Sequence, residues 1–236
     1  MMIRRTLTAV LALGVSGIGL VGCGFISAGP TATEVRDVSS GTTGVHVEGS
    51  GDVFFQPGDP ALTVTAGRNT LERIETEERS GVLRLHVDGG FLNSPGPIDY
   101  DLSLPELTSV AIEGSGSVTG AAAPADEVTI DIDGSGDIHL TEIEAEELTV
   151  VISGSGSIEL RGTVEHLDVL IEGSGEFHGN RLTATTAATS IEGSGDIEVM
   201  ATQSLDASIS GSGTIRHTGG GEVTEQIDGA GEITTG

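Results

Sequence analysis

Hydrophobic and polar residues alternate along short stretches of this chain, and the alternating stretches come in pairs. Residues 134–153 (GSGDIHLTEIEAEELTVVIS) contain one such pair. In the first stretch, Ile138 and Leu140 fall on one side of an extended chain and His139 falls on the other, and residues 148–152 repeat the pattern. A period of two predicts β-strands. Two short strands and two turns therefore predict one coil of a parallel β-helix.

A Gly-Ser-Gly triplet separates the strands of each pair and recurs along the chain. Eight copies start at Gly49, Gly114, Gly134, Gly154, Gly173, Gly193, Gly211 and Gly229, and the last copy reads Gly-Ala-Gly. From Gly114 onward, successive copies start 20, 20, 19, 20, 18 and 18 residues apart. Self-similarity at such a period predicts a solenoid in which each coil stacks on its neighbour.

Aligning the triplets produces two columns of aliphatic residues. One column lies two positions before each triplet: Val47, Ile112, Ile132, Ile152, Ile171, Ile191, Ile209 and Ile227. The other lies two positions after it: Val53, Val118, Ile138, Ile158, Phe177, Ile197, Ile215 and Ile233. Paired strands lie ~4.8 Å apart, so each column predicts a continuous buried ladder. The triplet is predicted to be a tight corner, since glycine accepts positive φ and the close approach of adjacent coils.

The N-terminus has the pattern of an export signal. Arg4 and Arg5 precede a short apolar stretch that ends in Leu-Val-Gly-Cys at Cys23. This ending resembles the lipobox of bacterial lipoproteins, in which the cysteine thiol takes a diacylglycerol. We therefore expect residues 1–22 to be a lipoprotein signal peptide, Cys23 to be the lipid attachment site and residues 23–34 to be a flexible tether. An ordinary secretory signal with an incidental cysteine is the alternative.

The repeated corners behind a lipobox resemble the bacterial "putative auto-transporter adhesin, head GIN domain" family, over residues 35–233. The resemblance implies a right-handed, two-sheet parallel β-helix in which the triplet turns the chain between sheets. It also implies cell-surface adhesion without an established catalytic site. The expected fold is an all-β, single-stranded right-handed parallel β-helix over residues 35–236, with coils of 18 to 20 residues. Residues 111–236 would be regular coils.

Residues 35–110 are less regular, and the resemblance implies that they are early coils that cap one end of the same helix. Arg79-Ser80-Gly81 is expected to be a turn, and residues 91–97 a loop. The strands expected here cover Ala61–Ala66, Ile74–Glu78, Val82–Val87 and Ile98–Leu104.

Composition limits the classes of partner. The chain has 36 acidic residues against 10 basic ones, all of them arginine, and a formal net charge of -26. Coulomb repulsion disfavours nucleic acid and anionic membrane surfaces as partners. Cys23 is the single cysteine, which excludes a disulfide within the chain.

Acidic residues flank the triplets and form a candidate calcium site. They lie before the corner at Glu48, Glu113, Asp133, Glu172, Glu192 and Asp228, and after it at Asp52, Asp137, Glu176, Asp196 and Glu232. Calcium-binding β-rolls use a nonapeptide with Asp inside the turn, which does not match this spacing. Ser117, Ser153, Ser157 and Ser210 also interrupt the columns. We favour a solvated, repulsive edge that keeps the helix soluble.

A second outward column reads Thr119, His139, Glu159, His178, Glu198 and Arg216. Zinc between His139, Glu159 and His178 is one interpretation, and a ladder of complementary cross-strand pairs is the one we favour. Val151 and Leu170 share another outward column and would form a small apolar spot.

These patterns predict a lipid-anchored, extracytoplasmic β-helix with a structural or adhesive role and no catalytic residues, metal or cofactor. Its partners would be the membrane, through Cys23, and an extracellular glycan or protein, with nucleic acid disfavoured. The rival prediction is a carbohydrate-binding or carbohydrate-cleaving β-helix, because some parallel β-helices are polysaccharide lyases or hydrolases. Against cleavage, the acidic residues recur as equivalents with no pair singled out, and lysine is absent. An envelope-sensing accessory role is a third possibility that the sequence does not separate from adhesion.

Overall fold

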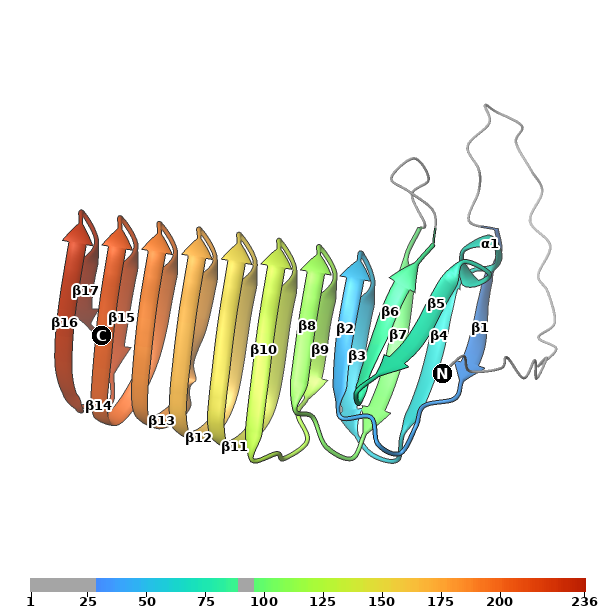
Figure 1. Ribbon diagram of the computed structural model, residues 1–236, viewed down its shortest axis with the longest axis horizontal. Helices are drawn as coiled ribbons and strands as arrows, with labels where there is room; N and C mark the ends of the chain where they lie inside the picture. Colours follow the sequence, from blue (N-terminus) through green and yellow to red (C-terminus); the bar gives the residue numbers. More distant parts are fainter. Residues whose placement is uncertain (1–28, 89–95) are drawn as a thin grey trace, which may run out of the picture.

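The computed structural model describes residues 29–88 and 96–236, which form one elongated stack of β-strand coils (Figure 1). The signal peptide, Cys23, most of the predicted tether and residues 91–95 of the expected loop lie outside the described residues. The predicted all-β solenoid is confirmed.

The regular coils place two rows of parallel strands on opposite sides of a thin core. The pre-triplet row contains β2 (Gly44–Gly49), β8 (Ser109–Gly114), β10 (Glu127–Gly134), the second halves of β11 (Asp137–Gly154), β12 (Ser157–Gly173), β13 (Glu176–Gly193) and β14 (Asp196–Gly211), and β16 (Glu222–Gly229). The post-triplet row contains β3 (Asp52–Pro57), β9 (Ser117–Ala121), the first halves of β11 to β14, β15 (Thr214–Thr218) and β17 (Glu232–Thr235). Each of β11 to β14 therefore runs from one row into the next coil of the other.

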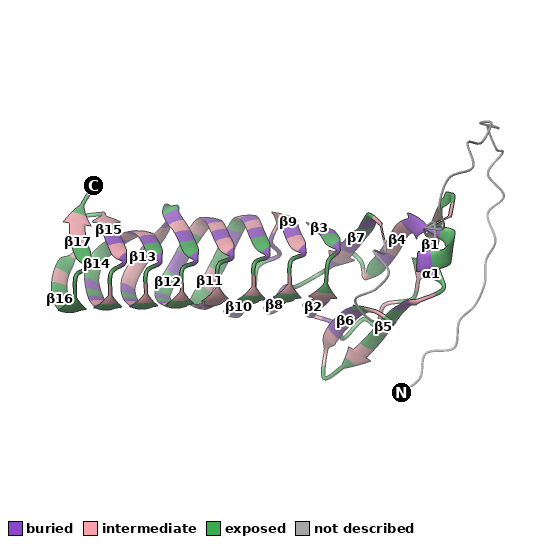
Figure 2. Ribbon diagram, turned by 90° about the horizontal axis from the view of Figure 1, so that it is seen from above, coloured by how far each residue is buried: buried purple, intermediate pink, exposed green. Residues whose placement is uncertain are grey.

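Both aliphatic columns lie in register inside the stack. Ile152 pairs with Ile171, and Ile158 pairs with Phe177, and all four side chains are fully buried. Buried and exposed residues alternate along each strand, as the period of two predicts (Figure 2). The last coil differs, because Ile227 is 45% exposed where β16 has a neighbouring strand on one side.

Each triplet lies where a strand of the pre-triplet row ends and one of the post-triplet row begins. The first glycine of all eight has positive φ, between 103° and 140°. Adjacent triplets are also hydrogen-bonded to each other: the Ser174 N–H donates to the carbonyl oxygen of Gly154 at 2.8 Å, and the Glu176 N–H donates to that of Gly156 at 3.0 Å. Backbone groups at the corners are thus satisfied from coil to coil.

The N-terminal end adds a cap to this stack. β6 (Val82–Val87) and β7 (Ile98–Leu104) pair in parallel with β2 and β3, so they form a coil of their own. The outermost elements are antiparallel strands and one short helix: β1 (Thr31–Arg36), β4 (Ala61–Gly67), α1 (Arg68–Leu71) and β5 (Ile74–Arg79). The four strands expected in this region are confirmed, and the expected turn joins β5 to β6, with Ser80 at φ 52°.

The order of coils in the cap does not follow the sequence. The coil of β2 and β3 lies between the coil of β6 and β7 and the coil of β8 and β9. The irregular early coils expected from the sequence are therefore a mixture of parallel coils and antiparallel strands.

The structure corrects the predicted tether. Strand β1 begins at Thr31, four positions before the tether was expected to end at residue 34. Two features hold it in place: Ala32 packs against the core, and the Arg36 guanidinium donates hydrogen bonds to the carbonyl oxygens of Ile74 (2.7 Å) and Leu71 (3.2 Å). The Thr-rich alternation of TATEVR is a strand pattern, and it was read as part of the tether.

Candidate functional site

The acidic columns beside the triplets lie on the outer edges of the corners. Glu48 pairs with Glu113, and Glu172 with Glu192, in adjacent coils of the pre-triplet row. Two of the serines that interrupt the columns donate hydrogen bonds to neighbouring carboxylates, Ser117 to Asp52 on another strand at 2.7 Å and Ser153 to Glu172 at 3.3 Å. A hydroxyl in place of a carboxylate thus supplies a donor and removes one repulsive neighbour.

The histidine and glutamate column of the post-triplet row is in register from Thr119 to Arg216. The Nδ1 atom of His139 lies 3.0 Å from a carboxylate oxygen of Glu159. The Arg216 guanidinium donates a hydrogen bond to Glu198 at 3.0 Å, and Asn180 donates another to the same carboxylate at 2.9 Å. The column is therefore a ladder of complementary pairs, as favoured from the sequence.

The zinc interpretation of this column needs His139, Glu159 and His178 around one point. The structure instead directs His178 toward Glu176 and Glu198, at 3.2 and 3.7 Å. Each histidine thus has a carboxylate partner of its own.

Glu159 has the strongest set of partners in this ladder. Two nitrogens of Arg161 donate to one of its carboxylate oxygens, at 2.7 and 3.1 Å. This hydrogen bonding is the main reason that the pKa of Glu159 is lowered, and the charge of His139 contributes further. A carboxylate held in its ionised form is suited to an electrostatic role and is a poor general acid at neutral pH.

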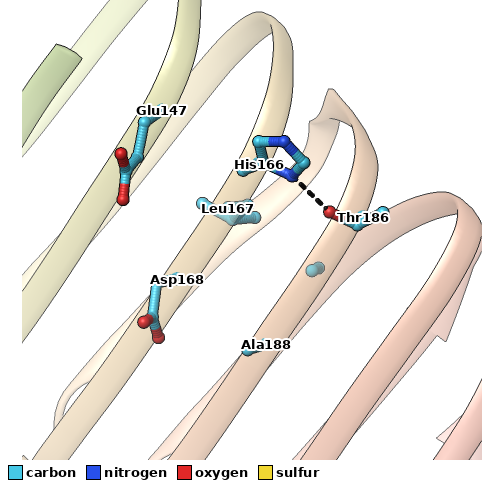
Figure 3. A pocket seen from close by; sticks show the side chains of 7 residues that line it. Glu147, His166, Leu167, Asp168, Thr186 and Ala188 are labelled. Atoms are coloured by element: carbon cyan, nitrogen blue, oxygen red, sulfur yellow. Dashed lines mark hydrogen bonds between the residues drawn. The ribbon is translucent and has the colours of Figure 1, made fainter.

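A shallow depression of about 240 Å³ lies on the pre-triplet row, where β11, β12 and β13 are neighbours (Figure 3). Its lining residues are Glu147, His166, Leu167, Asp168, Thr186, Ala187 and Ala188. The His166 ring nitrogen Nδ1 lies at hydrogen-bonding distance, 2.7 Å, from the Thr186 hydroxyl (Figure 3).

Small side chains on β13 create this depression. Ala187 pairs with Leu167, and Ala188 pairs with Asp168, so the surface drops from one coil to the next. The sequence carries a signal for it in the run TATTAATS, which interrupts the larger outward residues of the preceding coils. Sequence reasoning missed this site. Near it, Val151 and Leu170 are paired neighbours and partly exposed, so the predicted apolar spot is present.

The described part of the chain contains no helix long and apolar enough to cross a membrane. The single described helix, α1, has four residues.

Solved structures share this fold across nearly their whole length. An adhesin candidate from Bacteroides fragilis superposes with a TM-score of 0.82 at 22% identity, covering 87% of this chain and 97% of that one. A protein from Parabacteroides distasonis whose structure is titled as a putative lipid binding protein has a TM-score of 0.71 at 27% identity, covering 88% and 97%. A third, a putative adhesin from Parabacteroides merdae, has a TM-score of 0.65 at 19% identity, covering 88% and 97%. No curated protein matches the chain.

The family comparison covers the cap and the regular coils together. The family described as "Putative auto-transporter adhesin, head GIN domain" matches residues 29–221, which extend from the start of the described residues through β15. The match includes both the antiparallel cap and seven of the eight triplets, so it rests on the whole solenoid and not on the repeat alone. This chain belongs to the putative auto-transporter adhesin, head GIN domain family.

Proposed function

We propose that this protein is a non-catalytic, adhesion-type surface module, exported and held on the extracytoplasmic face of the membrane by lipid on Cys23. The observation that carries the proposal is the position of β1, which brings the chain into the stack at its capped end (Figure 1). Coils β8 to β17 extend away from that end. A lipid anchor before β1 would therefore project the coils outward.

Simple lengths support this arrangement. Cys23 precedes Thr31 by eight residues, which span at most about 28 Å when fully extended. From β6 to β16 the pre-triplet row holds nine strands, so at ~4.8 Å per step the stack is about 40 Å long. The anchor would keep the cap near the membrane and place the last coils farthest from it. The net charge of -26 would repel the coils from anionic headgroups.

The contact surface that fits this role best is the pre-triplet row around the depression and the Val151–Leu170 spot. It combines a hollow, two partly exposed aliphatic side chains and polar groups from His166 and Thr186. These features suit an extracellular glycan or protein, which offers hydroxyl groups and apolar patches together.

The anchor is tested by acyl labelling in cells. Wild type, Cys23→Ser and the nearby control Ser27→Ala are grown with an alkyne-tagged fatty acid and then fractionated. We expect label and membrane association in wild type and Ser27→Ala, and loss of the label in Cys23→Ser, because the thiol carries the acyl group. Equal labelling of Cys23→Ser would refute the anchor.

The contact surface is tested on an array of glycans and matrix proteins. Ala188→Phe would fill the depression and should abolish binding, whereas Thr119→Phe on the post-triplet row should leave it unchanged. Binding that survives Ala188→Phe would move the contact elsewhere.

Carbohydrate cleavage is the second candidate function, because Glu147 and Asp168 both line the depression. Release of sugar products from a bound glycan, lost in Asp168→Asn, would favour it over adhesion.

A further inference from the structure

A compact group of histidine and carboxylate side chains lies where the cap meets the regular coils. His46 and Glu48 are two positions apart on β2, so they share its outward face. On one side, Glu113 of β8 is the direct partner of Glu48. On the other side, β6 brings Arg84 opposite His46, and His86 follows two residues later. Three strands that are distant in sequence thus converge on one surface.

The ligand atoms of this group are close enough to share an ion. One donor atom each from His46, Glu48 and Glu113 lie within 4.8 Å of one another. The two imidazole nitrogens of His46 face different carboxylates, with Nδ1 3.9 Å from Glu48 and Nε2 3.8 Å from Glu113. His86 holds the second oxygen of Glu48, with its Nδ1 at 3.2 Å.

We propose that His46, Glu48 and Glu113 form a binding site for a divalent transition metal of the zinc type. Imidazole and carboxylate are donors that zinc prefers, and three protein ligands leave its fourth position for water or a partner group. Donors of a tetrahedral zinc ion lie roughly 3.3 to 3.5 Å apart, since each is about 2.0 to 2.2 Å from the metal. The site therefore needs to contract by about 0.5 to 1 Å, which side-chain rotation at a partly exposed surface can supply.

The surroundings of the three ligands fit this assignment. Glu48 is shielded, with 19% of its side chain exposed, against 66% for Glu113. Burial, followed by the charge of Arg84, lowers the pKa of His46, which favours the neutral imidazole that binds metals. His86 would act as a positioning residue that orients Glu48 from behind. Calcium fits poorly, because it takes six to eight oxygen ligands and only two carboxylates are present.

Arg84 is the competitor of the metal. Its guanidinium donates a hydrogen bond to Glu48, so it neutralises the carboxylate that the metal would use. The side chain is 35% exposed and can swing into solvent when an ion binds. Removing its charge should therefore tighten metal binding, whereas a merely structural ion pair would predict no such gain.

The location gives the site a role. It joins β6 and β2, which carry the cap, to β8, the first strand of the regular coils in sequence order. A bound ion would tie together residues 46, 48 and 113 and raise the stability of this junction by linkage.

The experiment uses the full chain, purified in detergent without a histidine tag and stripped with EDTA. Zinc chloride is titrated by calorimetry, with calcium chloride and magnesium chloride as comparison ions. We expect one zinc per chain and a higher melting temperature. His46→Asn and Glu113→Gln should each weaken zinc binding about 10- to 100-fold. Arg84→Gln should strengthen it.

His139→Asn is the matched control, because His139 also faces a glutamate but lies in the ladder of the post-triplet row. Glu113→Gln keeps the test decisive if His46→Asn fails to fold, since Glu113 is largely exposed. Wild-type zinc affinity in both site variants would overturn the proposal. So would an equal loss in His139→Asn, or calcium binding as tight as zinc.

Discussion

A Cβ atom added to Gly173 would lie 2.5 Å from the carbonyl oxygen of Gly154, one coil away in the stack. The contact is with backbone on both sides, and the φ angle of Gly173 is 129°, which side chains rarely adopt. Space and conformation thus both require glycine at this corner.

Gly173→Val should therefore lower the free energy of unfolding by ~2 kcal/mol or more. Ser174→Ala, in the same triplet, should be near neutral, because Ser174 is exposed and its printed contact to the next coil is made by the backbone. Urea denaturation of both variants measures the difference. Equal tolerance would mean that the triplets do not depend on glycine backbone geometry.

Glu142 is a second strained position, and here the residue present is not glycine. Its φ is 61°, and it lies at the irregularity between Leu140 and Ile143 where the pairing of β11 with β12 shifts register. Glu142→Asn should raise the free energy of unfolding by about 0.5 to 1 kcal/mol, because asparagine tolerates this conformation better. Glu144→Asn is the control, with the same charge change and no positive φ. If both variants gained equally, charge and not strain would be the cause.

Tyr100 provides a test of burial in the cap. Its ring is 2% exposed and covers Gly51 of the first triplet, where an added Cβ would lie 2.6 Å from the ring. Burial raises the pKa of Tyr100 to about 12. Since the folded value is the higher one, the neutral phenol stabilises the fold fully below about pH 10, and this contribution is lost as pH rises toward 12.

Tyr100 is the single tyrosine of the chain, which contains no lysine or tryptophan, so its ionisation can be followed by absorbance near 295 nm. We expect a midpoint near pH 12 in the folded protein and near 10 in urea. Tyr100→Phe should remove most of the loss of stability between pH 10 and 12. A midpoint near 10 in the folded protein would contradict the burial of the ring.

The acidic edge should respond to calcium only as it responds to salt. The carboxylate columns are interrupted by serines, two of which hydrogen-bond to the acids beside them. Calcium chloride and sodium chloride at equal ionic strength should therefore shift the melting temperature of EDTA-stripped protein alike.

Asp196→Asn should be neutral or slightly stabilising, because it removes the charge next to its strand partner Glu176. Saturable stabilisation by calcium that Asp196→Asn abolishes would show a calcium site at these corners.

The regular coils were predictable because every coil repeats the same local rule. Ile152, Ile171 and Ile191 occupy equivalent places in the sequence and pair directly in the structure. The right-handed sense of the coils stays a prediction, since it comes from the family resemblance and periodicity does not encode it.

The cap was harder to predict because its pairing is not local. β2 pairs with β8, so partners such as Thr43 and Thr108 are 65 residues apart, with no period to announce the register. The candidate zinc site was missed for the same reason. Its only local signal is a histidine two residues before a glutamate in GVHVEG, and the sequence does not reveal that β6 and β8 lie on either side.

This arrangement has a consequence for the order of folding. Neighbouring regular coils are 18 to 20 residues apart, so each can close a short loop onto the one before it. Joining β2 to β8 closes a loop of about 65 residues, which costs roughly 1 kcal/mol more in chain entropy than a coil of 20. We expect the regular coils to zip together by short-range contacts, and the coil of β2 and β3 to be the slow step, since it must be captured between two others. The same junction would then open first under denaturant, and an ion held by His46, Glu48 and Glu113 would slow that opening.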